Sequence, residues 1–571
     1  MEEQAALMAK ATPDARAFWA RQGTSLEVSM ELPLSGKGLK QATRHMSTYM
    51  ASQMRKGRRE ISERTLSPDE MKKFSSAKAT EVNNYVISSV LESLPPGVTP
   101  PPEEVMRMRW ILEWKIDEGT GDKKPKARIV VLGYMDPQYE HRPTTAPTMT
   151  RTSRHMVLQM MSWLGFKGYK ADVTGAFTQN REIQHDLFVM PVKELAAALG
   201  VPEGIAMRLR KAVYGLVEAA IEWFMTVSEA LEEFGWTQMK MDPCVWVLYG
   251  DAHGKNTGFT KEALKDFIDP GVLNELIAAK GDLDIVGVAG SHVDDFLLGG
   301  KESDPRWVRA REQIEGRFKW KTWETEEFMQ TGVRIKQQPD RSFRMDQSEY
   351  VKTIEKAYLS PERKRNKGAE TTDQEKGQLR AILGAIGWRS EQSGPMHSAD
   401  TSLLLSTIPS STVQTINETN RLVDRVRECA DLPVVIHSHS QAQVLVPIEW
   451  SDSSESNRPD GKSTKGLVAG LAPLKILRGD ETDVSLVSWK SGKIDRGCRS
   501  SVACETRSAV DAEDELLGIK LQWLEMTGAA QRPSSASCPG PSWWTPRACT
   551  TSSGPQSTRS AGRRRGLTWK R

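Results

Sequence analysis

Residues 293–298 read Val293-Asp294-Asp295-Phe296-Leu297-Leu298, which places two adjacent carboxylates between apolar residues. A strand–turn–strand hairpin would hold such a pair at an exposed tip. Two charges so placed need a cation, although two adjacent acids are also common in a solvated turn. A third carboxylate, Asp172, ends a predicted strand far earlier in the chain, in the segment Ala171-Asp172-Val173-Thr174-Gly175-Ala176-Phe177. Three carboxylates on neighbouring strands could together hold two Mg²⁺ ions.

Length and composition limit the class of protein that carries this pattern. The 571 residues exceed what a small binding module needs, and 38% hydrophobic and 27% charged residues favour a folded core. The 78 basic and 74 acidic residues leave a net charge of +4, so any nucleic-acid site must be a local patch. The apolar runs are too short to span a bilayer, and the six cysteines show no metal-binding spacing. We therefore expect an intracellular protein with no membrane partner.

Hydrophobic periodicity predicts a mixed α/β organisation. A polar helix beginning near Ser67 leads to a Pro-rich break, which predicts a helical arm and linker over residues 1–102. Strand and helix patterns then alternate through residues 103–359, with a surface excursion at 251–283. A charged stretch at 360–378 predicts a linker within residues 360–443, and a second α/β pattern occupies 444–526. Residues 527–571 are rich in Ser, Pro, Gly, Thr and Arg, which predicts a disordered tail.

The order of several motifs resembles the reverse transcriptase of copia-type (Ty/copia, Pseudoviridae) LTR-retrotransposon Pol polyproteins. The motifs are Lys126-Ala127-Arg128-Ile129-Val130, Ala146-Pro147-Thr148, Asp172 to Phe177, Val213-Tyr214-Gly215-Leu216, Asp242-Pro243-Cys244-Val245-Trp246, Val293-Asp294-Asp295 and Thr331-Gly332-Val333. The resemblance implies an α/β (α+β) right-hand polymerase. Fingers, palm and the start of the thumb would occupy 103–359, a thumb or connection region 360–443, and an incomplete ribonuclease H-like domain 444–526.

The resemblance also implies site residues. The catalytic, metal-binding carboxylates would be Asp172, Asp294 and Asp295, with two Mg²⁺ (or Mn²⁺) ions. The dNTP would contact Lys115, Lys126, Arg128 and Phe177, of which Phe177 would exclude a 2′-hydroxyl. The template and primer would contact Tyr214, Gly215, His292 and Gly332. Without the resemblance, exposed hairpin cations are usually only solvated, and an isolated Phe is usually a core residue.

Two departures from the family pattern bear on activity. His292 stands where the family usually has Tyr before Val-Asp-Asp. Residues 217–221 read Val-Glu-Ala-Ala-Ile where the family usually has Lys-Gln-Ala-Pro-Arg, which replaces two cations and adds the carboxylate of Glu218. A carboxylate near phosphates would weaken nucleic-acid binding, and we expect weak activity on this ground.

The second α/β segment resembles a ribonuclease H domain in which Asp452 and Glu505 match the first two catalytic carboxylates. Two metal ions need about four such ligands, and no later strand supplies the next one; Asp511 and Asp514 are expected on a solvated helix face. Trp543-Trp544-Thr545 must be encoded TGG-TGG-ACN, and reading one base earlier gives an apolar residue, Val and Asp. We therefore expect that a frameshift after Leu524 replaced the end of this domain and removed its ribonuclease activity.

Three interpretations follow from the sequence. The first is an RNA-directed DNA polymerase that joins dNTPs to a primer 3′-hydroxyl on an RNA or DNA template, acting in the cytoplasm within a virus-like particle or in the nucleus. The second is a degenerate retrotransposon remnant that keeps the fold and binds nucleic acid without catalysis. The third, an unrelated structural protein, leaves the order of the motifs unexplained.

Overall fold

The computed structural model describes residues 16–21, 24–29, 60–116, 122–250, 284–442 and 444–528, except 62, 64 and 65. The predicted excursion at 251–283 lies outside the described residues, as do residues 529–571 of the tail predicted for 527–571. Strands β1 (Arg16–Arg21) and β2 (Thr24–Ser29) form a separate antiparallel ladder. The described helices include none that is long and apolar enough to cross a membrane.

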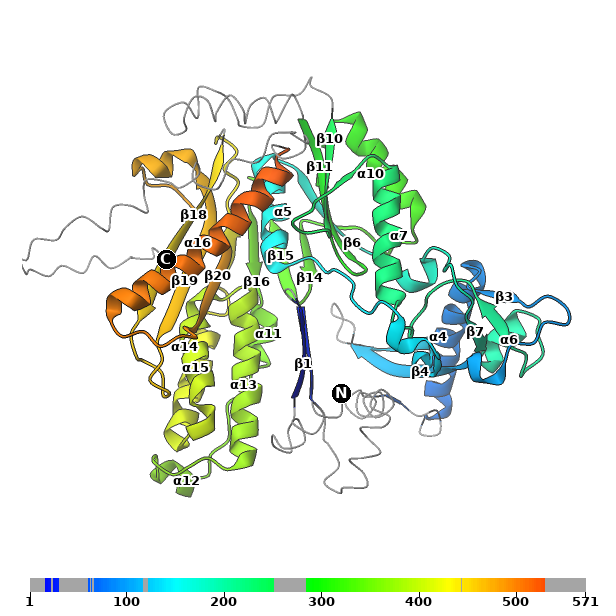
Figure 1. The fold of residues 1–571 in the computed structure, drawn as a ribbon, viewed down its shortest axis with the longest axis horizontal. Coiled ribbons are helices and arrows are strands. Elements are labelled where there is room, and N and C mark those ends of the chain that lie inside the picture. The colour runs from blue at the N-terminus through cyan, green and yellow to red at the C-terminus, as the bar shows by residue number, and fades with distance from the viewer. Residues whose placement is uncertain are drawn as a thin grey trace, which may run out of the picture.

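A six-stranded antiparallel sheet lies at the centre of the molecule (Figure 1). Its strands, in spatial order, are β13 (Glu324–Thr325), β6 (Lys167–Asp172), β12 (Asp295–Gly300), β11 (Asp284–His292), β10 (Val245–Gly250) and β9 (Thr237–Gln238). Side chains alternate between its two faces, as expected for strands. Phe296 and Leu298 pack with helices α7 (Ala219–Glu233) and α10 (Pro305–Arg317), whereas Leu297 packs with α5 (Arg151–Trp163). The predicted mixed α/β fold is confirmed.

The second unit is a five-stranded sheet covered by helix α4 (Pro68–Ile87). Its strands, in spatial order, are β3 (Leu91–Ser93), β8 (Met207–Leu209), β7 (Phe188–Met190), β4 (Val105–Ile116) and β5 (Lys123–Val131), and the short helix α6 (Lys193–Ala198) lies beside them. Helix α4 begins at the predicted N-cap Ser67, whose hydroxyl and the Glu70 carboxylate form a capping box.

Helix α4 belongs to the same core as the hairpin that follows the Pro-rich break. The buried Tyr85 hydroxyl donates to the Ile129 carbonyl over 2.9 Å, and β3 pairs with β8. Phe74 packs with Leu112 and Ala127. The arm predicted for residues 1–102 is therefore not a separate unit over its described part, because α4 and β3 need the later strands to cover their apolar side chains.

A four-stranded sheet and a helical bundle follow the central sheet in the chain. The strands are β14 (Glu327–Gln330), β15 (Val333–Gln337), β16 (Phe343–Asp346) and β17 (Val434–Ile436), and the helices are α11 (Ser348–Lys352), α12 (Pro361–Arg365), α13 (Asp373–Gln392), α14 (Ser398–Thr407) and α15 (Val413–Glu428). The linker predicted at 360–378 is wrong in part, because α12 and the start of α13 lie inside it. Thr372 and Glu375 form a capping box that begins α13 despite the surrounding charges.

The last described segment forms the three-stranded sheet β18 (Leu445–Ser454), β19 (Thr464–Pro473) and β20 (Ser485–Lys493), with helix α16 (Ser501–Met526) across it (Figure 1). The C-terminal half of α16 packs on the central unit. The Trp523 ring lies 5.8 Å from that of Trp163 on α5, and the Glu525 carboxylate accepts hydrogen bonds from the backbone amides of Lys240 and Met241. The unit predicted for 444–526 therefore shares one core with α5 and the central sheet.

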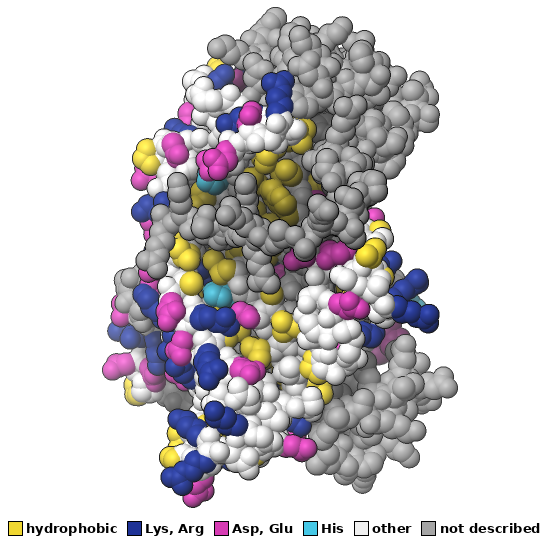
Figure 2. Space-filling view, turned by 90° about the vertical axis from the view of Figure 1, so that its left-hand side faces the viewer, with side chains coloured by type: hydrophobic (Ala, Val, Ile, Leu, Met, Phe, Trp, Pro, Cys, Tyr) yellow, Lys and Arg dark blue, Asp and Glu magenta, His cyan; other side chains and the backbone are white. Residues whose placement is uncertain are grey.

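The surface carries charges of both signs. On the face shown in Figure 2, Lys and Arg side chains lie among Asp and Glu side chains over much of the described surface. This distribution agrees with the small net charge of +4. It is typical of a surface on which a polyanion is attracted only locally.

Candidate active site

The three predicted carboxylates lie at one end of the central sheet. Asp172 ends β6 and is the direct cross-strand partner of Asp295, the first residue of β12. Asp294 lies in the turn that joins β11 to β12, and its carbonyl accepts a hydrogen bond from the amide of Val173 over 2.9 Å. The antiparallel register therefore brings together two carboxylates that are far apart in the sequence.

Burial and neighbouring charges give these carboxyl groups different pKa values. Burial raises the pKa of Asp295 to about 7; Lys170 opposes the rise, while Asp172 and Asp294 add to it. Burial also acts to raise the pKa of Asp172, but the hydrogen bond from Lys321 and the charge of Lys170 lower it overall. The Asp295 Oδ1 atom is buried without a hydrogen-bond partner. A cation at this position would offset an otherwise costly desolvation.

Two lysines that were not among the predicted site residues form ion pairs with Asp172 and Asp295. Lys321 Nζ lies 2.5 Å from Asp172 Oδ2, and Lys170 Nζ lies 3.6 Å from the same oxygen and 3.9 Å from Asp295 Oδ1. Lys170 precedes Asp172 by two positions on one strand, so alternation alone predicts that they share a face. Lys321 carried no such signal, because its backbone amide reaches the Asp172 carbonyl only in the folded chain.

The carboxylates fit a divalent cation by their chemistry, since hard ions such as Mg²⁺ and Mn²⁺ prefer oxygen ligands. The buried Asp295 Oδ1, which accepts no hydrogen bond, supports this fit. Among the described residues, however, no group of three or more His, Cys, Asp or Glu side chains is arranged to hold a metal. In this arrangement lysine ammonium groups neutralise Asp172, so an ion would have to compete with Lys321.

Replacing Lys321 with methionine is expected to strengthen binding of Mn²⁺ at this site by about tenfold, because it removes a competing charge beside Asp172. Mn²⁺ titration followed by electron paramagnetic resonance, without nucleic acid, measures the effect. Lys319→Met is the matched control, since Lys319 Nζ donates to Asn84 Oδ1 over 3.3 Å and the charge change is the same. Equal affinities in the two variants would contradict a competition between Lys321 and the ion.

Three of the predicted dNTP residues, Lys115, Lys126 and Arg128, lie on the β4–β5 hairpin. Burial lowers the pKa of Lys126, and the charges of Arg128, Lys115 and Lys321 lower it further, so these cations lie close together. Lys115 itself is exposed, and Arg128 pairs with Glu113 over 2.8 Å. Cations that lie this close together repel one another, and an anionic ligand would relieve that repulsion.

Two aromatic residues connect this cluster with the central sheet. The Arg128 guanidinium lies 5.6 Å from the centre of the Tyr214 ring, and the rings of Tyr214 and Phe177 lie 4.9 Å apart. Phe177 is half-buried in the 3₁₀ turn Ala176–Gln179, shortly after Asp172. Burial raises the pKa of Tyr214 to about 12, and Asp294 contributes to the rise. Tyr214 thus links the predicted dNTP residues Arg128 and Phe177, and its ring lies near enough to Asp294 to be affected by that charge.

The predicted template and primer residues lie in three different environments. Gly215 has φ of +99° and packs against the end of β5. Gly332, with φ of +73°, occupies the turn between β14 and β15. His292 is half-buried beside α5, where burial lowers its pKa and a hydrogen bond to the Met149 backbone opposes the shift. The His292 imidazole is therefore positioned by its hydrogen bond to the Met149 backbone.

The expected charge reversal at Glu218 is wrong. Glu218 is 3% exposed, and its carboxylate lies 3.0 Å from His185 Nε2 and 3.8 Å from Arg142 Nε. Because neighbouring side chains bind this carboxylate inside the protein, it does not present its charge to a phosphate on the surface. The carboxylate of Glu218 thus gives no electrostatic reason to expect weak activity, whereas the replacement of two cations by Val217 and Ile221 is unaffected by this finding.

The two predicted ribonuclease H residues lie on adjoining elements. Asp452 on β18 and Glu505 in the first turns of α16 are both exposed. Ser508, one turn after Glu505, donates to the Asp452 carbonyl over 2.9 Å. Asp511 is not on a solvated face as expected, because Lys465 of β19 pairs with it over 2.5 Å, whereas Asp514 is exposed.

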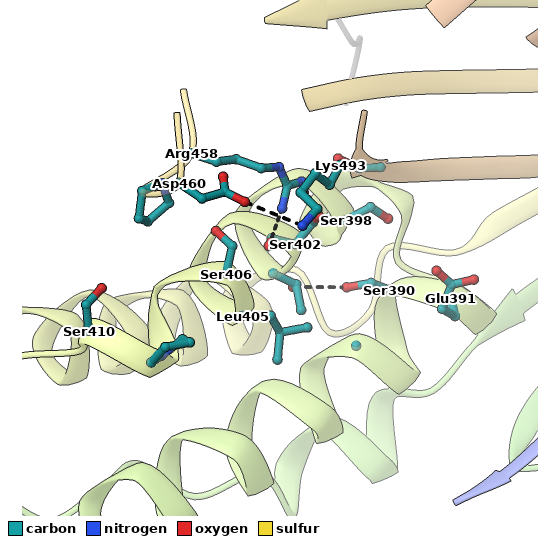
Figure 3. A pocket seen from close by; sticks show the side chains of 15 residues that line it. Ser390, Glu391, Ser398, Ser402, Leu405, Ser406, Ser410, Arg458, Asp460 and Lys493 are labelled. Atoms are coloured by element: carbon teal, nitrogen blue, oxygen red, sulfur yellow. Dashed lines mark hydrogen bonds and ion pairs between the residues drawn. The ribbon is translucent and has the colours of Figure 1, made fainter. Parts of the chain in front are cut away.

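A cavity of about 760 Å³ lies between α13, α14 and the end of β20 (Figure 3). Serine and threonine hydroxyls line much of it, and Arg458 crosses one wall to donate to Ser402 Oγ over 2.7 Å. Lys493 and Asp460 lie 3.4 Å apart beside it. None of the predicted site residues lines this cavity, so it gives no reason to place the candidate active site elsewhere.

Comparison with known proteins shows what part of this chain is similar to. Residues 97–257 match the family model "Reverse transcriptase (RNA-dependent DNA polymerase)". A Pol polyprotein of transposon RE2 from Arabidopsis thaliana is 27% identical over 173 residues, 30% of this chain and 12% of that polyprotein. That of transposon TNT 1-94 from Nicotiana tabacum is 23% identical over 157 residues, 27% of this chain and 11% of that one. These matches confirm the resemblance to copia-type Pol polyproteins.

The matched part spans about 12% of the length of these curated relatives. Among solved structures, a foamy viral protease-reverse transcriptase in complex with double-stranded DNA aligns with a TM-score of 0.41 and 10% identity. That alignment covers 79% of this chain and 61% of the viral chain.

Proposed function

We propose that residues 103–359 form an RNA-directed DNA polymerase, in which a primer 3′-hydroxyl displaces pyrophosphate from the α-phosphate of a dNTP. The observation that carries the proposal is the meeting of Asp172, Asp294 and Asp295 at one sheet end, next to Lys321, whose charge also acts on Lys126 of the β4–β5 hairpin. The similarity of residues 97–257 to the reverse transcriptase family model supports the reaction class.

Each group has a role in this proposal. Asp172 and Asp294, with Asp295 beside them, would hold two Mg²⁺ or Mn²⁺ ions, which when bound activate the attacking hydroxyl and offset phosphate charge. Lys126 and Arg128 would bind the triphosphate through charge-assisted hydrogen bonds, with Lys115 nearby. These cations need no metal to attract the anion, so dNTP binding and chemistry can be measured separately.

Other side chains would orient the reactants. Phe177, held by its contact with Tyr214, would pack under the sugar and leave no room for a 2′-hydroxyl, which favours dNTP over rNTP. Tyr214, Gly215 and His292 would border the template and primer, and the Gly332 turn would position the primer terminus. The partners are thus a primed RNA or DNA template and dNTPs, met in the cytoplasm, within a virus-like particle, or in the nucleus.

The second candidate is a remnant that binds nucleic acid without extending it. The ammonium group of Lys321 on Asp172 is the observation that favours it, because a lysine that cannot be displaced would keep the metal ligands occupied. We also propose that residues 444–526 do not cleave RNA, since Asp452 and Glu505 are exposed and among the described residues no third carboxylate joins them.

Primer extension tests the proposed function. The purified chain is incubated with a primed RNA template, dNTPs and Mg²⁺, and binding of the same template is followed by fluorescence anisotropy. Extension supports the polymerase. Binding without extension by a folded chain supports the remnant.

A further inference from the structure

Arg154 is a buried cation that links several elements around the candidate active site. It lies on α5 and is 3% exposed. Its Nη1 donates to Thr331 Oγ1 over 2.9 Å, and its Nη2 donates to Gln392 Oε1 over 3.0 Å. Thr331 belongs to the turn before β15, whereas Gln392 is the last residue of α13. One guanidinium group thus joins three segments that are distant in the sequence.

Keeping a guanidinium in this position is costly for the fold. Its hydrogen-bond partners here are neutral, and its Nε is buried with no partner. Burial lowers the pKa of Arg154 to about 10, with the charge of Asp295 opposing the shift, so the group stays protonated at neutral pH. A neutral side chain would pack in this core with less desolvation cost, which indicates that the charge and its planar set of donors serve a purpose.

The turn that Arg154 holds has a backbone that few residues adopt. Thr331 and Gly332 have φ of +47° and +73°, both in the left-handed region. The Thr331 backbone amide also interacts with the Asp295 carboxylate. A non-glycine residue in this conformation is strained and needs surrounding contacts to stay there. The hydrogen bond from Arg154 to the Thr331 hydroxyl is such a contact. It is made to the same residue whose backbone amide interacts with the candidate catalytic carboxylate of Asp295.

The C-terminal end of α13 lies against the same turn. A Cβ atom built on Gly332 would lie 3.9 Å from the Trp388 indole nitrogen. Trp388 is 42% exposed and stands one turn before Gln392, which Arg154 binds. The position of this helix end and the position of the turn are thus connected through α5.

We propose that Arg154 is a positioning residue that couples the C-terminal end of α13 to the Thr331–Gly332 turn, and through that turn sets where a primer terminus lies relative to Asp295. The effect on the primer rests on the proposed polymerase function. The coupling itself does not, because it concerns contacts within the folded chain. Loss of the guanidinium would release the turn from the helix even in an inactive protein.

Arg151 provides a matched control one turn earlier on α5. Its guanidinium donates to the Glu391 carboxylate of α13 over 2.9 Å and to the Trp489 carbonyl of β20 over 3.1 Å, and it lies 4.2 Å from the centre of the Trp489 ring. It therefore holds the same end of α13 but reaches β20 instead of the Thr331 turn. A merely structural role for buried arginines on α5 would affect both variants alike.

Hydrogen exchange of the full chain, measured by mass spectrometry, distinguishes the proposed coupling through Arg154 from a merely structural role. In Arg154→Gln, amides of residues 328–335 are expected to exchange about tenfold faster, which corresponds to about 1.4 kcal/mol of lost local stability. In Arg151→Gln these amides keep their wild-type rates, whereas residues 388–392 exchange faster in both variants. If the Thr331 turn is unchanged in Arg154→Gln, or is loosened equally in Arg151→Gln, the coupling is refuted.

Primer kinetics provide the functional readout. Arg154→Gln is expected to raise KM for the primer–template about tenfold while KM for dNTP stays the same, and Arg154→Lys is expected to restore only part of the loss because lysine cannot bridge two acceptors in a plane. Equal effects on both KM values would overturn a role in primer placement. Should Arg154→Gln not fold, Thr331→Val removes the same hydrogen bond from the other side. A wild type that does not extend primers refutes the polymerase, whereas the exchange rates still decide the coupling.

Discussion

Gly215→Ala is expected to destabilise the protein by about 3–5 kcal/mol, or to prevent folding. A Cβ at this position would lie 2.0 Å from the Val131 carbonyl oxygen and 2.6 Å from Val130 Cγ1, and the residue has φ of +99°. The clash is with backbone that cannot turn away, because the Val131 amide donates to the Tyr214 carbonyl over 2.8 Å. Urea unfolding followed by tryptophan fluorescence measures the loss.

Gly200→Ala is the control for this prediction. Gly200 also has positive φ, of +70°, but a Cβ there would meet nothing within 4 Å. Its replacement carries only the left-handed backbone cost of about 1 kcal/mol. If Gly215→Ala is as mild as Gly200→Ala, the close approach between the Tyr214–Gly215 segment and β5 is not present in the protein.

Removing α16 is expected to unfold the central unit together with the C-terminal sheet. A chain that ends at Ser500 exposes the α5 and β10 surfaces that Trp523 and Met526 cover, and such a chain should be insoluble or lose its near-ultraviolet circular dichroism. A separate ribonuclease H-like domain would instead leave a folded polymerase unit behind. A soluble, cooperatively unfolding chain of 500 residues would show that the two units are independent.

A single substitution tests the same contact without truncation. Glu525→Gln replaces one acceptor oxygen with an NH2 group, so one of the backbone amides of Lys240 and Met241 loses its acceptor and the other keeps only a neutral one. The expected loss is about 1.5–3 kcal/mol. Glu505→Gln makes the same change at an exposed position on the same helix, and should stay within about 0.5 kcal/mol of the wild type. Equal stabilities of the two variants would argue against the docking of α16.

Local patterns in the sequence predicted much of the fold and the site. The strand–turn–strand pattern around Asp294 and the strand that ends at Asp172 follow from period-two alternation, and the start of α4 follows from the cap at Ser67. These signals depend on residues near each other in the chain. The grouping of the carboxylates with Lys126 and Arg128 came instead from the family resemblance.

The parts that the sequence did not reveal depend on contacts between distant residues. Lys321 meets Asp172, and Arg154 meets Thr331, across more than a hundred positions with no local pattern to indicate either pair. For Glu218 the sequence predicted a surface charge that the structure does not have. A charged residue was assumed to be exposed, and its partners His185 and Arg142 could not be recognised from the sequence. The packing of α16 on α5 was missed for the same reason, since a pattern of apolar residues does not name its partner.

Extension of a primer on an RNA template by the wild type and by Asp294→Asn tests the polymerase claim most directly. We expect Mg²⁺-dependent extension by the wild type and a loss of about 1,000-fold or more in Asp294→Asn, equivalent to about 4 kcal/mol of transition-state stabilisation. Asp431→Asn, the same change at an exposed carboxylate away from the site, should extend like the wild type. Template binding without extension by the folded wild type, or equal extension by Asp294→Asn, would contradict a working polymerase site at the end of the central sheet.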